Sequence, residues 1–345
     1  MNENLRRYFY SLMTDAPAAQ GLPAVRGLLS YLIKCLLGFF SMAYLCVEKG
    51  TFLLYKYNVL KSYRPKCKVI SVGNITLGGT GKTPLVIAIA RHLRDSGKKV
   101  AILSRGYRGE KGSKTSDEVE LFRKRLPDIP VFIGRDRVAT AKDAESRFVP
   151  HVLLLDDGFQ HWRLKRDLDI VTINGKNPFG NGQLIPRGIL REPKSSLYRA
   201  DVIIVTKGGP IPDEIRKIND KAEIFLSSYE AADTAGINGK KVAMVCAIGD
   251  PSSFEDTLLS LGAHIVRKFI FMDHHIYSAS DVARMISETV TAGSDTIVTT
   301  EKDMVKLSRL VKGGEVKFEA VGIEMKIDNE EKFFGRLDSV FAGKI

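Results

Sequence analysis

A phosphate-binding pattern at residues 69–85 constrains this chain more than any other feature. The segment reads V-I-S-V-G-N-I-T-L-G-G-T-G-K-T-P-L, which is an apolar strand, a glycine-rich turn and the start of a helix. Such a turn needs glycines so that backbone N–H groups can close on phosphate oxygens, a lysine for the terminal phosphates and a hydroxyl for Mg²⁺. The pattern therefore predicts an α/β protein that binds ATP with Mg²⁺. The predicted contacts are Thr76, Leu77, Gly78, Gly79, Thr80, Gly81, Lys82 and Thr83.

One position departs from the usual spacing G-x-x-x-x-G-K-[ST], because Thr76 stands where its first glycine would be. Gly78 and Gly79 keep the turn flexible, so we expect the site to be retained. A glycine-rich turn that binds nothing is the alternative. The strand before the turn, the helix after it and an acidic strand end downstream favour nucleotide binding. Pro84 in the first helical turn is harmless, since no N–H is needed there.

The rest of the chain alternates apolar runs of strand length with helical patterns, which predicts a mostly parallel sheet flanked by helices. Strands are expected at 69–72, 100–104, 130–133, 152–155, 168–173, 202–206, 242–247, 265–271 and 296–299, and helices at 84–95, 135–146, 252–261 and 278–291. Few signals mark residues 208–239. We therefore expect an N-terminal helical arm at 1–68, a P-loop lobe at 69–207, a connecting segment at 208–239 and a smaller C-terminal α/β lobe at 240–345.

The arm is both apolar and basic. The chain has a formal charge of +12, and residues 1–68 hold ten Lys or Arg against three acids. Within them, residues 28–47 carry Lys34 as their only charge. Twenty such residues could just cross a bilayer, but apolar surface beside cations is also typical of a helix lying in the lipid interface. We expect membrane contact, with interfacial binding favoured over a span; a buried helical hairpin and a cleaved signal peptide are the alternatives.

Other partners have weaker support in the sequence. The four cysteines form no C-x-x-C pair and no zinc spacing, which is typical of reduced cysteines in a cytosolic protein. No zinc finger, RNP motif or helix-turn-helix spacing stands out, so the basic charge alone does not indicate nucleic-acid binding. We expect no nucleic-acid partner and no obligate protein partner.

A second group of candidate site residues follows the predicted strand at 152–155. Asp156 and Asp157 come directly after it, at the edge where open α/β sheets bind ligands. An acid at this position in P-loop enzymes holds Mg²⁺ directly or through water. A lone aspartate here would more often be a turn residue, but two of them beside a phosphate loop favour a metal or phosphate role.

Several motifs in one order identify a family. They are V-G-N at 72–74, S-R-G-Y at 104–107, D-E at 117–118, D-D-G-F-Q-H at 156–161, L-R-E-P at 190–193, D-H-H at 273–275 and T-E-K-D at 300–303. Together they resemble the tetraacyldisaccharide 4'-kinase family, the lipid A 4'-kinases, from the apolar arm nearly to the C-terminus. The resemblance implies transfer of the ATP γ-phosphoryl group to the 4'-hydroxyl of a tetraacylated glucosamine disaccharide 1-phosphate. The product would be lipid IVA, made at the cytoplasmic face of the bacterial inner membrane.

The resemblance also assigns roles to individual residues. Lys82 would hold the β- and γ-phosphates and assist the transfer, and Glu192 would be a metal ligand together with Thr83. Asp156 or Asp157 would complete or support that metal site. Asp117 resembles the family's proposed base, paired with His274, although an acid at this position could instead be a simple helix start. Arg105, Gln160, His161 and Arg191 are weaker candidates for phosphate or sugar contacts.

Two rival functions deserve comparison. A membrane-associated P-loop ATPase switch would need a lysine at position 77, where Leu77 stands. A metal phosphoesterase could use D-H-H, but it would need further aspartate and histidine clusters at earlier strand ends, which the chain lacks. The kinase function is therefore favoured.

Overall fold

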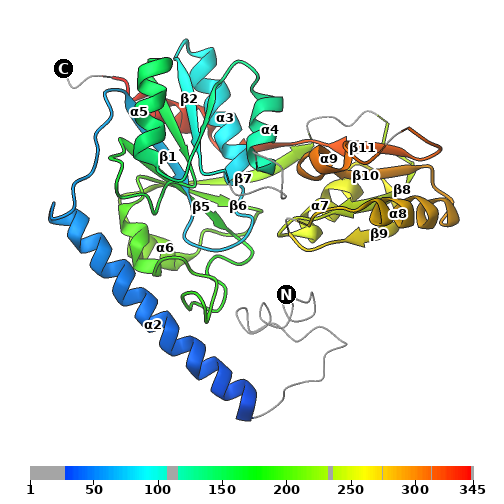
Figure 1. The fold of residues 1–345 in the computed structure, drawn as a ribbon, viewed down its shortest axis with the longest axis horizontal. Helices are drawn as coiled ribbons and strands as arrows, with labels where there is room; N and C mark the ends of the chain where they lie inside the picture. The colour runs from blue at the N-terminus through cyan, green and yellow to red at the C-terminus, as the bar shows by residue number, and fades with distance from the viewer. Residues whose placement is uncertain (1–27, 107–115, 232–235, 274, 312, 343–345) are drawn as a thin grey trace.

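Two sheets of different size, one mostly parallel and one fully parallel, organise the molecule, a computed structural model that describes residues 28–106, 116–231, 236–273, 275–311 and 313–342. The larger sheet has the strand order β12-β7-β6-β5-β1-β4-β2-β3, and the smaller one β11-β10-β8-β9. Figure 1 shows the two lobes side by side. The predicted fold class is confirmed: a P-loop-like, mostly parallel sheet flanked by helices, with a smaller α/β lobe and an N-terminal apolar helix.

The large sheet is built around central strands that are buried on both faces. Its members are β1 (Lys68–Gly73), β2 (Val100–Ser104), β3 (Val131–Ile133), β4 (Val152–Asp156), β5 (Leu168–Asn174), β6 (Val202–Thr206), β7 (Glu223–Ala231) and β12 (Ile323–Ile327). Neighbouring strands pair in parallel except β12, which runs antiparallel to β7. The central strands are nearly continuous apolar runs because helices cover both faces of the sheet.

Alternation along each strand divides the core into two layers. Ile70 and Ile102 face a cluster shared with α3 (Lys82–Asp95), α4 (Asp117–Arg125) and α10 (Glu330–Asp338). Val69 and Ala101 face the opposite layer, covered by α5 (Arg137–Arg147). Farther along that side, η1 (Lys194–Arg199) and α6 (Asp213–Ile218) cover β5 and β6.

The small lobe repeats the layered arrangement. Its four parallel strands are β8 (Lys241–Cys246), β9 (His264–Ile270), β10 (Thr296–Thr300) and β11 (Lys317–Val321), with helices α7 (Pro251–Ser260), α8 (Ala279–Thr291) and α9 (Glu301–Leu307). The two lobes meet where α4 lies against α9 (Figure 1). Since α4 begins at Asp117, this contact brings the small lobe to one of the candidate site residues.

The chain passes between the lobes differently from the expected linear order. The sequence predicts a connecting segment at 208–239, but α6 and β7 lie within it, and β7 joins the large sheet. Likewise β12 and α10, within the stretch expected to form the small lobe, return to the large one. The sequence does not clearly predict β7, because this strand has Glu, Ser and Tyr at partly exposed positions where the central strands have an apolar run.

Helix α2 (Leu28–Lys56) lies outside both lobes and extends past the large one (Figure 1). Among the described residues, this is the helix long and apolar enough to cross a membrane, and only 6% of its apolar window is buried in the protein. One side of it carries exposed apolar side chains: Tyr31, Leu32, Leu36, Phe39, Phe40, Met42 and Val47. The other side contacts the large lobe, where Phe52 packs edge-on against Trp162.

Candidate active site

The loop between β1 and α3 has the backbone geometry of a phosphate-binding turn. Gly78 and Gly81 have φ angles of +103° and +83°, which side chains other than glycine rarely tolerate. A Cβ at Gly81 would also lie 2.2 Å from the hydroxyl of Tyr229 on β7. Lys82 and Thr83 then form the first turn of α3, so the N-terminus of this helix faces the loop.

Thr76 occupies its unusual position because this half of the loop is extended. It forms an antiparallel bridge with Leu190, and the N–H of Leu77 donates to the carbonyl of Ile189 at 2.7 Å. The amide of Asn74 donates to the Thr76 carbonyl at 2.8 Å. Thr76 has no positive φ, so a β-branched residue suits the position where other P-loops have glycine.

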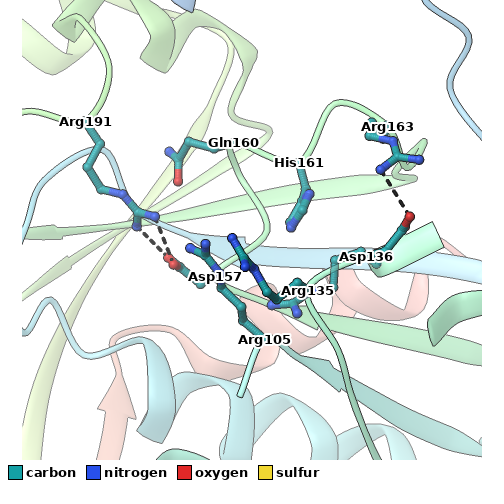
Figure 2. Close-up of a pocket in the computed structure, with 9 residues that line it drawn as sticks. Arg105, Arg135, Asp136, Asp157, Gln160, His161, Arg163 and Arg191 are labelled. Carbon is teal, nitrogen blue, oxygen red and sulfur yellow. Dashed lines mark hydrogen bonds and ion pairs between the residues drawn. The ribbon is translucent and has the colours of Figure 1, made fainter. Parts of the chain in front are cut away.

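Asp157 links the P-loop lysine to an arginine. Its Oδ1 lies 3.5 Å from Lys82 Nζ, and both its oxygens accept from Arg191, at 2.8 and 3.0 Å (Figure 2). Burial acts to raise the pKa of Asp157, but the nearby Lys82 and Arg191 outweigh it and hold the pKa well below its usual range. Arg191 also donates to Asn74 Oδ1 at 3.1 Å, which ties this group to the phosphate loop.

Asp156 is in the opposite electrostatic situation. Burial, reinforced by the charge of Asp157, raises the pKa of Asp156 to about 6. Its Oδ2 accepts from the Ser104 hydroxyl at 3.0 Å, and its backbone carbonyl accepts from Arg137 at 3.2 Å. A cation that binds beside a buried carboxyl group of this kind favours its ionised form.

Glu192 is fully buried and held at both oxygens. Gln160 donates to Oε1 at 2.9 Å and Arg199 to Oε2 at 2.6 Å. The guanidinium of Arg199 lies over the rings of Phe159 and Phe52, at 4.3 and 5.0 Å from their centroids. Because Phe52 belongs to α2, the apolar arm contributes to the support of this carboxylate.

A cavity of about 430 Å³ adjoins Asp157. Five arginines line it, together with Asp136, Asp157, Gln160 and His161: Arg105, Arg135, Arg137, Arg163 and Arg191 (Figure 2). Burial, with the charge of Arg137, lowers the pKa of His161 to about 4, so this imidazole is neutral at pH 7. A cavity with this excess of guanidinium groups suits a phosphate or another anionic group.

The carboxylate of Asp117 meets the small lobe. Asp117 is the first residue of α4, after the N-cap Ser116, so the helix-start interpretation describes its backbone correctly. Its side chain is nevertheless engaged, because Asp117 Oδ2 lies 2.8 Å from Lys306 Nζ on α9. His274, its expected partner, lies outside the described residues.

The neighbour of His274 lies close to the phosphate loop. A Cβ built on Gly249 would be 3.1 Å from the Gly79 nitrogen and 3.5 Å from Asp273 Oδ2. Gly249 therefore lies between the two, at a close approach of the lobes. Asp273 Oδ1 is also 3.5 Å from Lys302 Nζ.

The acids of the described residues do not form a metal site by themselves. In this part of the chain, no three His, Cys, Asp or Glu side chains lie close enough together to hold an ion. Mg²⁺ in P-loop proteins is bound by nucleotide phosphates, water, a Ser or Thr hydroxyl and one or two carboxylates. Thr83 and the buried Asp156 therefore fit an ion that arrives with a nucleotide.

The predicted residues thus fall into groups. Lys82, Asp157, Arg191, Gln160 and Glu192 form one connected network with Asn74, while Arg105 and His161 line the adjoining cavity. Sequence reasoning missed further members of the site: Arg135, Arg137, Arg163, Arg199 and Lys306. The first two follow β3, and their place at a strand's carboxyl end is the signal that could have found them.

Comparison with known proteins gives one consistent family match. The family model for LpxK, tetraacyldisaccharide-1-P 4'-kinase, matches residues 33–342. The chain is 35% identical to the tetraacyldisaccharide 4'-kinase of Halothermothrix orenii, over 90% of each protein. It is 37% identical to that of Syntrophus aciditrophicus, over 81% of this chain and 85% of the relative.

A solved structure extends the likeness to three dimensions. The crystal structure of LpxK from Aquifex aeolicus in complex with ATP aligns with a TM-score of 0.70 and 29% identity, covering 90% of this chain and 99% of the other. The resemblance predicted from the motifs is confirmed. This chain belongs to the tetraacyldisaccharide-1-P 4'-kinase family.

Proposed function

We propose that this protein transfers the γ-phosphoryl group of ATP to the 4'-hydroxyl of tetraacyldisaccharide 1-phosphate, giving lipid IVA for lipid A biosynthesis. One observation carries the proposal beyond family membership. Asp157 joins the P-loop residue Lys82 to Arg191, a residue that lines the arginine-rich cavity. A triphosphate site and a site for an anionic acceptor therefore adjoin at one carboxylate.

ATP binds along the loop from Thr76 to Thr83. Backbone N–H groups of the loop surround the phosphates, and Lys82 contacts the β- and γ-phosphates. Lys82 Nζ lies 3.5 Å from Asp157 Oδ1, which points the ammonium toward the site.

Thr83, Asp156 or Asp157, and Glu192 are the proposed ligands, or the supports of the ligands, for a Mg²⁺ ion that would bind together with the nucleotide. The bound ion would neutralise charge on the β- and γ-phosphates. Hydrogen bonds hold these carboxylates in position: Ser104 orients Asp156, and Gln160 with Arg199 orients Glu192.

Asp117 and His274 are the proposed pair that removes the proton of the acceptor hydroxyl. A carboxylate that orients an imidazole makes it a better base in the required tautomer. The nearness of Asp273 to the Gly249–Gly79 contact supports this role, because residue 274 follows it directly. Arg105, Gln160, His161 and Arg191 are proposed to contact the phosphate and sugar of the acceptor.

The acceptor reaches the site from a membrane. Exposed apolar side chains on α2, such as Leu36 and Phe40, are proposed to enter the lipid, with nearby lysines at the anionic headgroups. The proposed location is the cytoplasmic face of the inner membrane, where the protein is peripheral or anchored by its N-terminal segment. The opposite side of α2 touches the large lobe, so the lipid-facing helix borders the catalytic site.

The ATPase-switch alternative has no specific support. Leu77 replaces the lysine that such a loop requires, and the family match covers nearly the whole chain.

The direct test is incubation with [γ-³²P]ATP and purified tetraacyldisaccharide 1-phosphate in detergent, followed by chromatography of the lipids. We expect label in a doubly phosphorylated lipid, and its loss in Lys82→Ala. Absence of labelled lipid from a preparation that binds ATP would refute the proposed function.

A further inference from the structure

The contact between the two lobes is a row of ion pairs. Helix α4 presents acids, while α9 and the turn that follows it present bases, and one pair runs in the opposite sense. The pairs are Asp117–Lys306, Glu118–Lys302, Glu120–Arg309 and, reversed, Arg125–Glu301. The motif T-E-K-D at 300–303 supplies the start of this surface, with the Thr300 hydroxyl accepting from the Asp303 N–H as the cap of α9.

Lys306 and Arg309 differ in their surroundings. Its ammonium lies 2.8 Å from Asp117 Oδ2 and 3.8 Å from Asp303 Oδ1, and it donates to the His275 carbonyl at 3.3 Å. Its side chain is only 15% exposed, whereas that of Arg309 is 50% exposed. A cation in such a shielded position interacts more strongly with its partners than a surface cation does.

The three partners of Lys306 belong to different parts of the fold. Asp117 opens α4 in the large lobe, while His275 lies in the loop after β9 in the small lobe. Asp303 is fully buried, and its other oxygen, Oδ2, accepts from the Ala247 N–H at 2.9 Å at the end of β8. One ammonium thus connects a carboxylate of the large lobe to two separate segments of the small lobe.

We propose that Lys306 is a positioning residue for phosphoryl transfer, which fixes the Asp117 carboxylate relative to the 273–275 segment. The inference rests on the proposed function, in which Asp117 removes the acceptor proton together with His274. The contact with the His275 carbonyl fixes the backbone one residue after that histidine. Lys306 acts through these groups and takes no part in binding ATP.

A simple role in holding the lobes together would make different predictions. Arg309, in the turn that follows α9, also pairs with α4 through Glu120, and it therefore serves as a matched control at the same interface. If Lys306 only holds the lobes together, its loss should lower the melting temperature more than loss of Arg309 does, but kcat of the folded protein should respond similarly to both. If it positions Asp117, only its own loss should slow the chemical step.

The experiment compares Lys306→Met with Arg309→Met in the full-length protein, measuring kcat and KM for ATP and for lipid, with ATP binding and thermal melting alongside. We expect Lys306→Met to lower kcat at least tenfold with KM for ATP changed less than threefold, and Arg309→Met to keep kcat within threefold of the wild type. Should Lys306→Met not fold, because Asp303 loses its nearby cation, Lys306→Gln takes its place.

Two results would overturn the inference. One is a kcat for Lys306→Met or Lys306→Gln within threefold of the wild type. The other is an equal loss of kcat in Lys306→Met and Arg309→Met, which would assign Lys306 to lobe contact alone. Wild-type phosphorylation of the lipid is measured in the same assay, so failure of this inference is distinct from failure of the proposed function.

Discussion

The hydroxyl of Tyr44 donates a hydrogen bond to the backbone carbonyl of Arg191, across 2.7 Å. One turn earlier on α2, the Ser41 hydroxyl donates to the Leu184 carbonyl at 2.8 Å and accepts from the Arg187 N–H at 3.0 Å. The segment that α2 grips in this way continues to Leu190, which forms the bridge with Thr76. The arm is therefore connected to the phosphate loop through one intervening stretch of chain.

Removal of the Tyr44 hydroxyl tests that connection. Tyr44→Phe leaves the Arg191 carbonyl without this donor, and the hydrogen bond's contribution to stability, about 1 kcal/mol, is lost. We expect phosphoryl transfer to fall about two- to tenfold while binding to lipid vesicles stays unchanged. Tyr31→Phe on the same helix is the control, because Tyr31 is 66% exposed. Equal activities of the two variants would show that the hydrogen bond does not support the site.

The exposed side of α2 is expected to bind lipid. The double variant Phe39→Ser/Phe40→Ser removes two adjacent rings that are 69% and 50% exposed. Burial of each ring in lipid contributes about 1.5 to 3 kcal/mol, so we expect vesicle affinity to fall at least tenfold. Sedimentation with phosphatidylglycerol-containing vesicles measures it. Leu259→Ser, which removes an exposed apolar side chain on α7, should leave sedimentation unchanged; an identical result for both would exclude lipid contact through α2.

The raised pKa of Asp156 predicts a pH-dependent stability in the absence of nucleotide. Its pKa is about 6 in the folded protein and about 4 when unfolded. The penalty for ionising this buried carboxyl group is therefore absent below pH 4, and the free energy of unfolding declines as the pH rises through 6. Asp156→Asn removes the penalty, so we expect it to stabilise the protein by about 1 to 3 kcal/mol at pH 8.

Chemical denaturation of both proteins at pH 4.5 and pH 8 checks this prediction. The stabilising effect should shrink at the lower pH, where the wild-type carboxyl is protonated. Asp143→Asn serves as the control, since Asp143 forms an exposed i,i+4 pair with Arg147. A pH-independent difference between Asp156→Asn and the wild type would contradict the assigned cause.

The glycine at position 81 is expected to be essential. Gly81→Ala must accommodate a methyl group 2.2 Å from the Tyr229 hydroxyl at a φ of +83°. We expect the melting temperature to fall by several degrees and ATP affinity to weaken at least tenfold. Gly79→Ala meets no atom within 4 Å and has no positive φ, so its melting temperature should match the wild type. Equal melting temperatures for both variants would argue against the strained geometry.

Loss of the proposed base should separate binding from turnover. We expect Asp117→Asn and His274→Ala each to lower kcat by about 10²- to 10⁴-fold, the usual contribution of general base catalysis. Binding of ATP, measured by calorimetry, should persist in both. Asp128→Asn, at an exposed position just after α4, should retain normal turnover. Near-normal activity in either of the first two variants would remove that residue from the mechanism.

The sequence predicted those elements whose signal is local. The strands from β1 to β6 are nearly continuous apolar runs, and the turn at 74–81 carries its chemistry in consecutive residues. By contrast, β12 pairs with β7 from about a hundred residues away, and its exposed edge alternates charged and apolar side chains. Nothing in its own residues determines which strand it joins.

The same distinction separates the site residues. Lys82, Asp157 and Arg191 stand in short motifs, and the structure brings them together. Arg137 and Arg199 were missed, because an arginine becomes part of a site only through the partners that burial gives it. Arg199 depends on three aromatic rings from distant segments, Phe52, Phe159 and Trp162, which no local pattern records.

The pairing of β7 with β12 determines how the small lobe is attached to the large one. Ala231 and Ile323 pair at the end of this antiparallel ribbon, so the chain leaves and re-enters the large sheet at neighbouring points. The small lobe is thus attached at this place by two chain connections and at a second place by the ion pairs of α4, so cutting one connection would leave it bound through the other. The chain between these two residues is therefore an insertion into the large lobe that a short turn could replace.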